Sequence, residues 1–160
     1  MLGVGLLAPI LAAAGAVVMP RTASAETCST YTHRYFLGAG SAITLRIAFV
    51  DTALKVCRGD EGVTGAFASQ TVGTTGPGNA AGFSIDAGLA IVDQMGSPIV
   101  RASYAGRLRI CLVQRTPLCS SSSDYEITVR LGTPTIGDPN APDWYHAPES
   151  PGGVHYYEDA

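Results

Sequence analysis

The residues that could carry out chemistry are few, and His33 is the first of them. Histidine is the usual proton-transfer side chain of enzymes that work near neutral pH, and residues 26–132 contain only this one. A Ser-His-Asp site would also need a serine held for attack, and the Gly-x-Ser-x-Gly signature occurs nowhere in the sequence. We therefore expect a protein that is not an enzyme, and a small hydrolase that uses His33 is the third hypothesis.

The acidic residues give no sign of a catalytic pair. Asp60 and Glu61 are adjacent in a glycine-rich segment, and Asp86 and Asp93 flank a predicted strand. A glycosidase needs two carboxyl groups that face each other about 5–10 Å apart, and these spacings do not indicate such a pair. We interpret all four as turn or solvent-exposed residues.

A metal site is not predicted either. His146 and His155 have acidic neighbours in the sequence, and imidazole combined with carboxylate suits Zn²⁺ or Cu²⁺. Their spacing matches no familiar metal site, and the cysteines lack Cys-x-x-Cys or Cys-x-x-His spacing. We expect neither a metal nor any other cofactor.

A short loop between two cysteines could bind a protease. Cys111 and Cys119 enclose seven residues, with Arg115 and Thr116 near the middle. If the two cysteines are bonded, the loop would present Arg115 in a fixed conformation, and a preorganised loop binds at a low entropic cost. The segment is similar to the binding loops of small secreted serine-protease inhibitors, so such an inhibitor is the second hypothesis. The alternative is an inter-strand loop with a structural disulfide.

Aromatic residues gather in the last part of the chain. Residues 133–160 are rich in Pro and Gly and contain five acidic residues but no Lys or Arg, so they are expected to bury little apolar surface. Two aromatic clusters flank a Pro-Gly-Gly turn signal, which predicts a disordered tail or a small ribbon in which the clusters pair. Aromatic anchors are typical of segments that fold on binding, and the predicted binding residues are Trp144, Tyr145, His146, His155, Tyr156 and Tyr157.

The N-terminus has the pattern of an export signal. Residues 2–19 form an uncharged apolar run of eighteen residues, followed by Pro20, Arg21 and an Ala-x-Ala sequence at residues 23–25. We expect a signal peptide over residues 1–25 with cleavage after Ala25. Membrane contact is expected only if this segment is retained as an anchor.

The cysteines fit an exported protein. All four, Cys28, Cys57, Cys111 and Cys119, follow the predicted cleavage site, and an even number in an oxidising compartment predicts two disulfides. Three pairings are possible, of which we favour Cys28–Cys57 with Cys111–Cys119. Nine of the ten basic residues are Arg, a usage that resembles bacterial proteins from high-GC genomes.

Charge excludes one class of partner. The chain has ten basic and thirteen acidic residues and a formal net charge of −3, so no basic excess is available to bind nucleic acid. Charged residues make up 14% and hydrophobic residues 46%, which favours a folded domain over a disordered chain.

Hydrophobic alternation with period two predicts strands. Odd-numbered residues are apolar from Ile43 to Phe49, and even-numbered ones follow at Leu54 and Val56, so we expect a turn or bulge near residues 51–52. Residues 58–80 should contain at most one short strand, around residues 63–67, and a mobile loop over residues 73–79. A hairpin is predicted over residues 89–102, and further strands over residues 108–112 and 125–131. The predicted fold is an all-β antiparallel β-sandwich, jelly-roll-like or Ig-like, over residues 26–132.

One segment resembles a known family. Leu89-x-Ile91-Val92-Asp93-x-x-Gly96, Gly106-x-Leu108-x-Ile110 and Asp124-Tyr125-x-Ile127-x-Val129 look like the second half of secreted bacterial modules of the pre-peptidase C-terminal type. The resemblance implies a small non-catalytic sandwich. The leading hypothesis is thus a secreted, disulfide-stabilised, non-catalytic binding protein of the cell exterior. Its partner would be another extracellular protein or a cell-envelope polymer, contacted by the tail or by the loops at one end of the sandwich.

Overall fold

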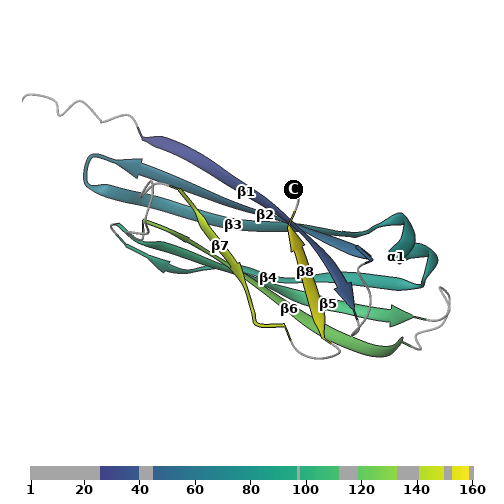
Figure 1. The fold of residues 1–160 in the computed structure, drawn as a ribbon. Coiled ribbons are helices and arrows are strands. Elements are labelled where there is room, and N and C mark those ends of the chain that lie inside the picture. The colour runs from purple at the N-terminus through teal and green to yellow at the C-terminus, as the bar shows by residue number, and fades with distance from the viewer. Residues whose placement is uncertain are drawn as a thin grey trace, which may run out of the picture.

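The computed structural model describes residues 26–39, 45–96, 98–111, 119–132, 141–149 and 153–158. These residues form six long strands, two short ones and one short helix (Figure 1). In chain order the elements are β1 (Thr27–Ala39), β2 (Ala48–Gly59), β3 (Gly62–Thr74), α1 (Gly76–Ala80), β4 (Phe83–Met95), β5 (Val100–Cys111), β6 (Cys119–Leu131), β7 (Asp143–His146) and β8 (Val154–Glu158).

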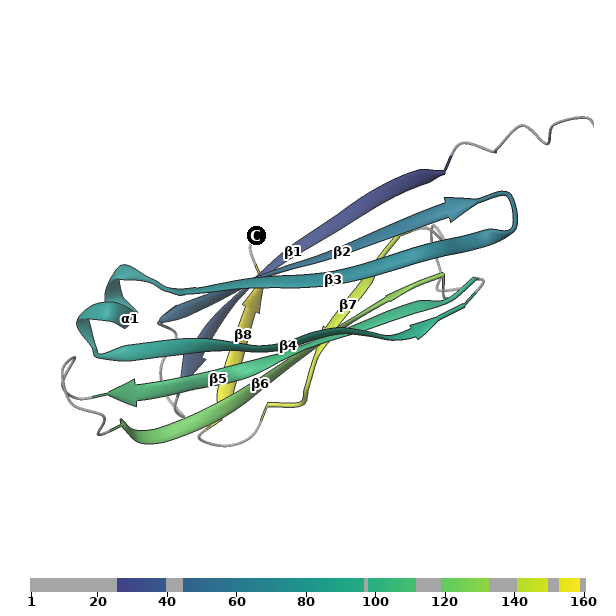
Figure 2. The ribbon, with the colours of Figure 1, turned by 180° about the vertical axis from the view of Figure 1, so that it is seen from behind.

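The strands form two antiparallel sheets of four strands each. Sheet A has the order β3-β2-β1-β8, and sheet B has the order β4-β5-β6-β7. The sheets lie over each other as two layers, with α1 at the end where the chain passes from β3 to β4 (Figure 2). The prediction of an all-β antiparallel fold is confirmed. No helix in the described ranges is long and apolar enough to span a membrane.

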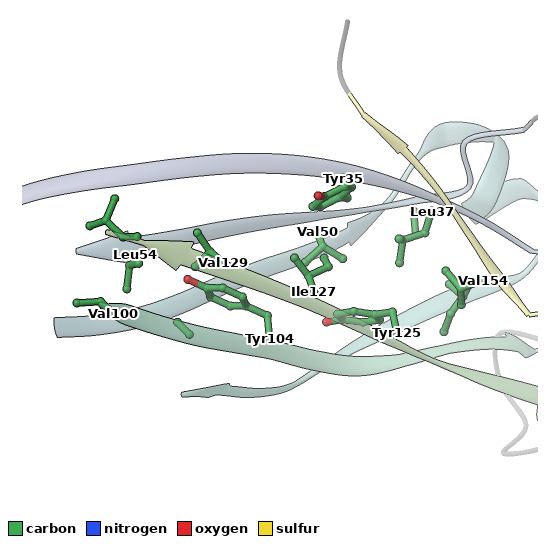
Figure 3. Packing of buried hydrophobic residues seen from close by; sticks show 14 of the residues in the cluster. Tyr35, Leu37, Val50, Leu54, Val100, Tyr104, Tyr125, Ile127, Val129 and Val154 are labelled. Carbon is green, nitrogen blue, oxygen red and sulfur yellow. The ribbon is translucent and has the colours of Figure 1, made fainter. Parts of the chain in front are cut away.

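A single hydrophobic core fills the space between the sheets. Alternate residues of the long strands point inward, as Val50 and Leu54 do from sheet A and as Ile127 and Val129 do from sheet B (Figure 3). Apolar burial of this kind contributes about 25 cal/mol per Å². Three tyrosines are the largest side chains that are fully buried: Tyr35, Tyr104 and Tyr125.

The turn predicted near residues 51–52 is wrong, because β2 continues through it. The even-numbered residues of β2 from Ala48 to Val56 are buried, and the register with β1 is regular through this region. Phe49 therefore lies on the outer face of sheet A although it continues an odd-numbered apolar series. The parity of the apolar residues changes in the sequence because Phe49 is apolar but faces outward, whereas Val50 and Leu54 face the core.

The prediction for residues 58–80 is also wrong. β3 extends from Gly62 to Thr74 and pairs with the whole length of β2, since main-chain pairing with a neighbouring strand outweighs the low strand propensity of glycine. The segment expected to be a mobile loop, residues 73–79, instead contains the end of β3 and most of α1. The side chain of Thr75 caps this helix by accepting a hydrogen bond from Gly78 N, and its hydroxyl donates to Arg46 O at 2.6 Å.

The tail contributes one strand to each sheet. β7 pairs with β6, from Ile127 opposite His146 to Arg130 opposite Asp143, and β8 pairs with the second half of β1. The two aromatic clusters thus extend different sheets instead of pairing with each other as a ribbon. Val154 is 4% exposed and belongs to the core, so the tail buries more apolar surface than its Pro and Gly content suggests.

Two disulfides join neighbouring strands. Cys28 of β1 is bonded to Cys57 of β2, and Cys111 of β5 is bonded to Cys119 of β6, which is the pairing favoured from the sequence. The predicted signal segment, residues 1–25, lies outside the described residues. So do residues 112–118, which include Arg115 and Thr116 of the hypothetical inhibitor loop.

Candidate binding face on sheet A

The outer face of sheet A carries a hollow at its centre, which we call the sheet A hollow. Its volume is about 550 Å³. The small side chain of Ala53 leaves space in the middle strand, with Thr32 opposite it on β1 and Ser69 opposite it on β3. The residues that line the hollow are Thr32, His33, Arg34, Asp51, Thr52, Ala53, Ser69, Gln70 and Thr71.

One ion pair borders the sheet A hollow. The Arg34 guanidinium donates to both carboxylate oxygens of Asp51, with Nη2 2.7 Å from Oδ2, and this two-bond geometry fixes both side chains. The two side chains are 45% and 37% exposed, so their hydrogen bonds are accessible to a ligand. The guanidinium also lies over the ring of Phe49, 5.0 Å from its centre.

Aromatic rings lie against glycines on the same outer face. A Cβ atom on Gly73 would lie 2.5 Å from Cζ of Phe49, and one on Gly65 would lie 3.5 Å from Cε2 of Phe67. Each ring therefore covers the place where a neighbouring side chain would stand, and it lies along the sheet instead of projecting from it. Phe67 is 64% exposed, which gives this face a flat apolar surface beside the hollow.

A glutamine beneath the sheet A hollow links the two sheets. Gln70 Nε2 donates to Leu89 O and Ala105 O of sheet B, both at 2.9 Å, and its Oε1 accepts from the Tyr125 hydroxyl at 3.1 Å. These bonds use both donors and the acceptor of the amide. The hollow therefore has a rigid floor, because its central residues are tied to the opposite sheet.

A larger hollow, of about 690 Å³, lies at sheet B, and tail residues such as Pro148 and Val154 line it together with strands of that sheet. Two ion pairs cross it, Arg107 with Asp124 at 2.7 Å and Arg109 with Asp86 at 2.9 Å. All four side chains are at least 42% exposed, and ion pairs this exposed contribute little to stability. Ala105 corresponds to Ala53, because it lies on β5, a central strand of sheet B, and lines the larger hollow.

The tail residues predicted to bind a partner lie mainly against the body of the protein. Trp144 stacks on His33 with ring centres 5.5 Å apart, and His146 stacks on Tyr156 at 4.1 Å. The Tyr156 hydroxyl accepts a hydrogen bond from Glu126 N at 3.1 Å, so it joins sheet A to sheet B. These contacts give the inward half of the predicted tail site a structural role.

The outward tail residues are also engaged. Tyr145 lies under the guanidinium of Arg130 at 5.0 Å, and the ring of Tyr157 covers Gly38. His155 Nδ1 is 2.7 Å from Glu149 Oε2. The backbone N–H of Tyr156, followed by the bond with His155, holds the pKa of Glu149 below its ordinary value. The six aromatic and histidine residues are thus divided between both sheets, with His146 and Tyr156 in contact where the two sheets meet.

His33 lies on the inner side of β1 beside Tyr35 and Trp144. Its Nε2 atom is buried and has no hydrogen-bond partner among the described residues, so no nucleophile is held against that atom. Within the described ranges no group of three or more His, Cys, Asp or Glu residues could hold a metal ion.

The residues of the sheet A hollow carry no recognisable motif in the sequence. The residues of the hollow have small and common side chains: Ala53, Ser69 and Thr71. Phe67 lies in a predicted short strand, but the sequence does not indicate on which side of the sheet it points. The one sequence feature that could have indicated these residues is the alternation of inward and outward side chains along β2. Once Val50 and Leu54 point inward, Asp51 and Ala53 must point outward, and the strands paired with β2 then place their own outward residues beside them.

Comparison of the chain with protein-family models, with curated proteins and with solved structures found no match. The resemblance to modules of the pre-peptidase C-terminal type therefore stays a prediction. The site is interpreted from its own geometry: an open polar hollow, a rigid floor, one ion pair and flat aromatic rings.

Proposed function

We propose that this chain is a secreted, non-catalytic binding protein of the cell exterior and that the outer face of sheet A is its contact surface. The observation that carries the proposal is the open hollow over Ala53, bordered by the Arg34–Asp51 pair and by the exposed ring of Phe67. Polar groups that fix orientation next to apolar surface are what recognition sites share. The partner we favour is a cell-envelope polymer.

Secretion is supported by the chemistry of the cysteines. Two disulfides are formed, and such bonds persist in oxidising compartments outside the cytosol. The apolar segment before Ala25 supports export with cleavage. We further propose that the two facing sheets belong to the jelly-roll-like or Ig-like sandwiches, because β8 returns from sheet B to lie beside β1, a connection of the Greek-key kind.

The contact surface is tested by filling the hollow. Ala53→Trp places a large side chain in the sheet A hollow without touching the core, and Ala105→Trp does the same in the sheet B hollow. We expect Ala53→Trp to abolish capture of the protein by isolated cell-envelope material and Ala105→Trp to leave capture unchanged. Circular dichroism and thermal unfolding establish that both variants fold. Undiminished capture of folded Ala53→Trp would show that the proposed contact surface is wrong.

A serine-protease inhibitor is the second candidate, because the Cys111–Cys119 bond closes the loop that contains Arg115 and Thr116. Such an inhibitor should slow a trypsin-like protease stoichiometrically and should lose this effect in Arg115→Ala. Thr116→Ala is the neighbouring comparison. Full protease activity in the presence of excess wild-type protein would exclude this candidate.

A further inference from the structure

We infer that the ligand of the sheet A hollow is an internal segment of an unbranched, uncharged polysaccharide that lies along the strands. This inference rests on the proposed function and specifies its ligand class. It is drawn from the hydroxyl groups of the hollow, its balanced charge and the flat ring beside it.

Hydroxyl groups surround the centre of the hollow. Thr32, Ser69 and Thr71 are exposed and stand around Ala53 on both neighbouring strands. A hydroxyl both donates and accepts hydrogen bonds, so these groups match a ligand whose own groups do the same at many positions. A polysaccharide presents such hydroxyls along its whole length.

The charges of the two ionised residues that line the hollow, Arg34 and Asp51, cancel. Arg34 and Asp51 are bonded to each other through two hydrogen bonds, so a charged ligand would have to compete with an existing partner. Arg34 and Asp51 still have accessible polar edges, and an uncharged hydroxyl can bond to either one without separating them. The hollow is therefore suited to a polar ligand without net charge.

Phe67 supplies an apolar contact at one end of the hollow. It lies opposite Lys55 of β2 in the register, six residues along that strand from Phe49. At about 3.3 Å per residue the two rings border a surface roughly 20 Å long. The ring of Phe67 lies along the sheet over Gly65, so its face can pack against the C–H face of a sugar ring. This length accommodates several sugar units.

The same features disfavour a protein partner. Protein interfaces are apolar at the centre and polar at the rim, whereas this face has its polar hollow at the centre. An extended peptide adds to the edge of a sheet, and the hollow is centred on β2, which has β1 and β3 on either side. A polymer lying across the face needs no free strand edge.

The test measures binding of purified full-length protein to size-graded linear oligosaccharides from the uncharged polymers glucan, xylan, mannan and chitin. Titration calorimetry should show binding to at least one series, with affinity that rises with chain length and levels off when the chain spans about 20 Å. Affinity should not change when salt is added, since screening acts on charged ligands. Phe67→Ala should weaken binding about tenfold, and Ala53→Trp should abolish it.

The controls are matched in exposure and position. Met95 is 57% exposed, close to the 64% of Phe67, and it lies on β4 of the other sheet, so Met95→Ala should bind normally. Ala105→Trp should also bind normally, because it keeps the main-chain oxygen that accepts from Gln70. Absence of binding in every series would overturn the inference, as would an affinity that falls steeply with salt. If envelope capture still depends on Ala53 but is lost after protease treatment of the envelope, the proposed function stands and the ligand is a protein.

Discussion

Three buried tyrosines differ in what their hydroxyl groups contact. Tyr104 donates to Ala53 O at 2.9 Å across the core, and Tyr125 donates to Gln70. Tyr35 is completely buried, but its hydroxyl has no partner in the described part of the chain. A net hydrogen bond contributes about 1 kcal/mol, whereas a buried hydroxyl without a partner costs free energy.

Substituting two of these tyrosines by phenylalanine should therefore have different effects on stability. Tyr104→Phe removes a hydrogen bond and should lower the free energy of unfolding by about 1 kcal/mol. Tyr35→Phe removes only a hydroxyl without a partner and should leave stability unchanged or raise it. Urea unfolding monitored by circular dichroism measures both. A loss in Tyr35→Phe equal to that in Tyr104→Phe would mean that the Tyr35 hydroxyl is bonded in solution.

At the scale of elements, alternation predicted the strands whose apolar residues all point inward. The segments around Leu108 and Ile127 were predicted on this basis and lie in β5 and β6. The same rule failed at β2, because Phe49 is apolar and faces outward. It failed again at β3, whose inward residues include Ala66, Ala68 and Gln70 and give no apolar period.

The candidate site could not be predicted from the sequence because its residues are distant in the chain. Thr32, Ala53 and Ser69 become neighbours only through the register of three strands. The tail was misjudged for a related reason. Its composition indicates poor packing, but the sheet edges at β1 and β6 provide the main-chain partners that an isolated tail lacks.

The tail strands should consequently be required for stability. Trp144 packs on His33 and against the core, whereas Tyr145, its neighbour on β7, points outward beneath Arg130. Trp144→Ala should lower the free energy of unfolding by about 2 kcal/mol, roughly half the cost of removing a fully buried aromatic ring. Tyr145→Ala should cost about 0.5–1 kcal/mol, the value of an exposed cation–π contact.

Truncation after Gly132 removes both tail strands and should leave a chain that is partly unfolded or melts at a much lower temperature. Denaturant titration and thermal melting compare the truncated chain with the two point variants. A truncated chain as stable as the full chain would show that β7 and β8 are dispensable, and Tyr145→Ala serves as the control for the point variants.

At the scale of the whole molecule, the buried tyrosines of the core make the free energy of unfolding depend on pH in the alkaline range. Burial raises the pKa of Tyr35 to about 12, with the charges of Glu158 and Asp143 adding to the effect, and burial likewise raises the pKa of Tyr125 to about 12. The pKa of Tyr104 rises in the same direction for the same reason. In the unfolded chain tyrosine ionises near pH 10, so the two states bind different numbers of protons above this pH.

The sign of this effect predicts alkaline unfolding. Between about pH 10 and 12 the unfolded chain loses phenolic protons that the folded chain retains, so the free energy of unfolding falls as pH rises, by about 1.4 kcal/mol per pH unit for each fully coupled tyrosine. Below pH 10 these groups do not make the free energy of unfolding depend on pH.

We expect phenolate absorbance of the buried tyrosines to appear together with the loss of the β-sheet circular dichroism signal. Tyr125→Phe should make the pH dependence shallower, and Leu89→Ala, which removes no proton, should leave the slope unchanged. Ionisation of these tyrosines well before the sheet signal is lost would show that the space between the two sheets admits water in the folded state.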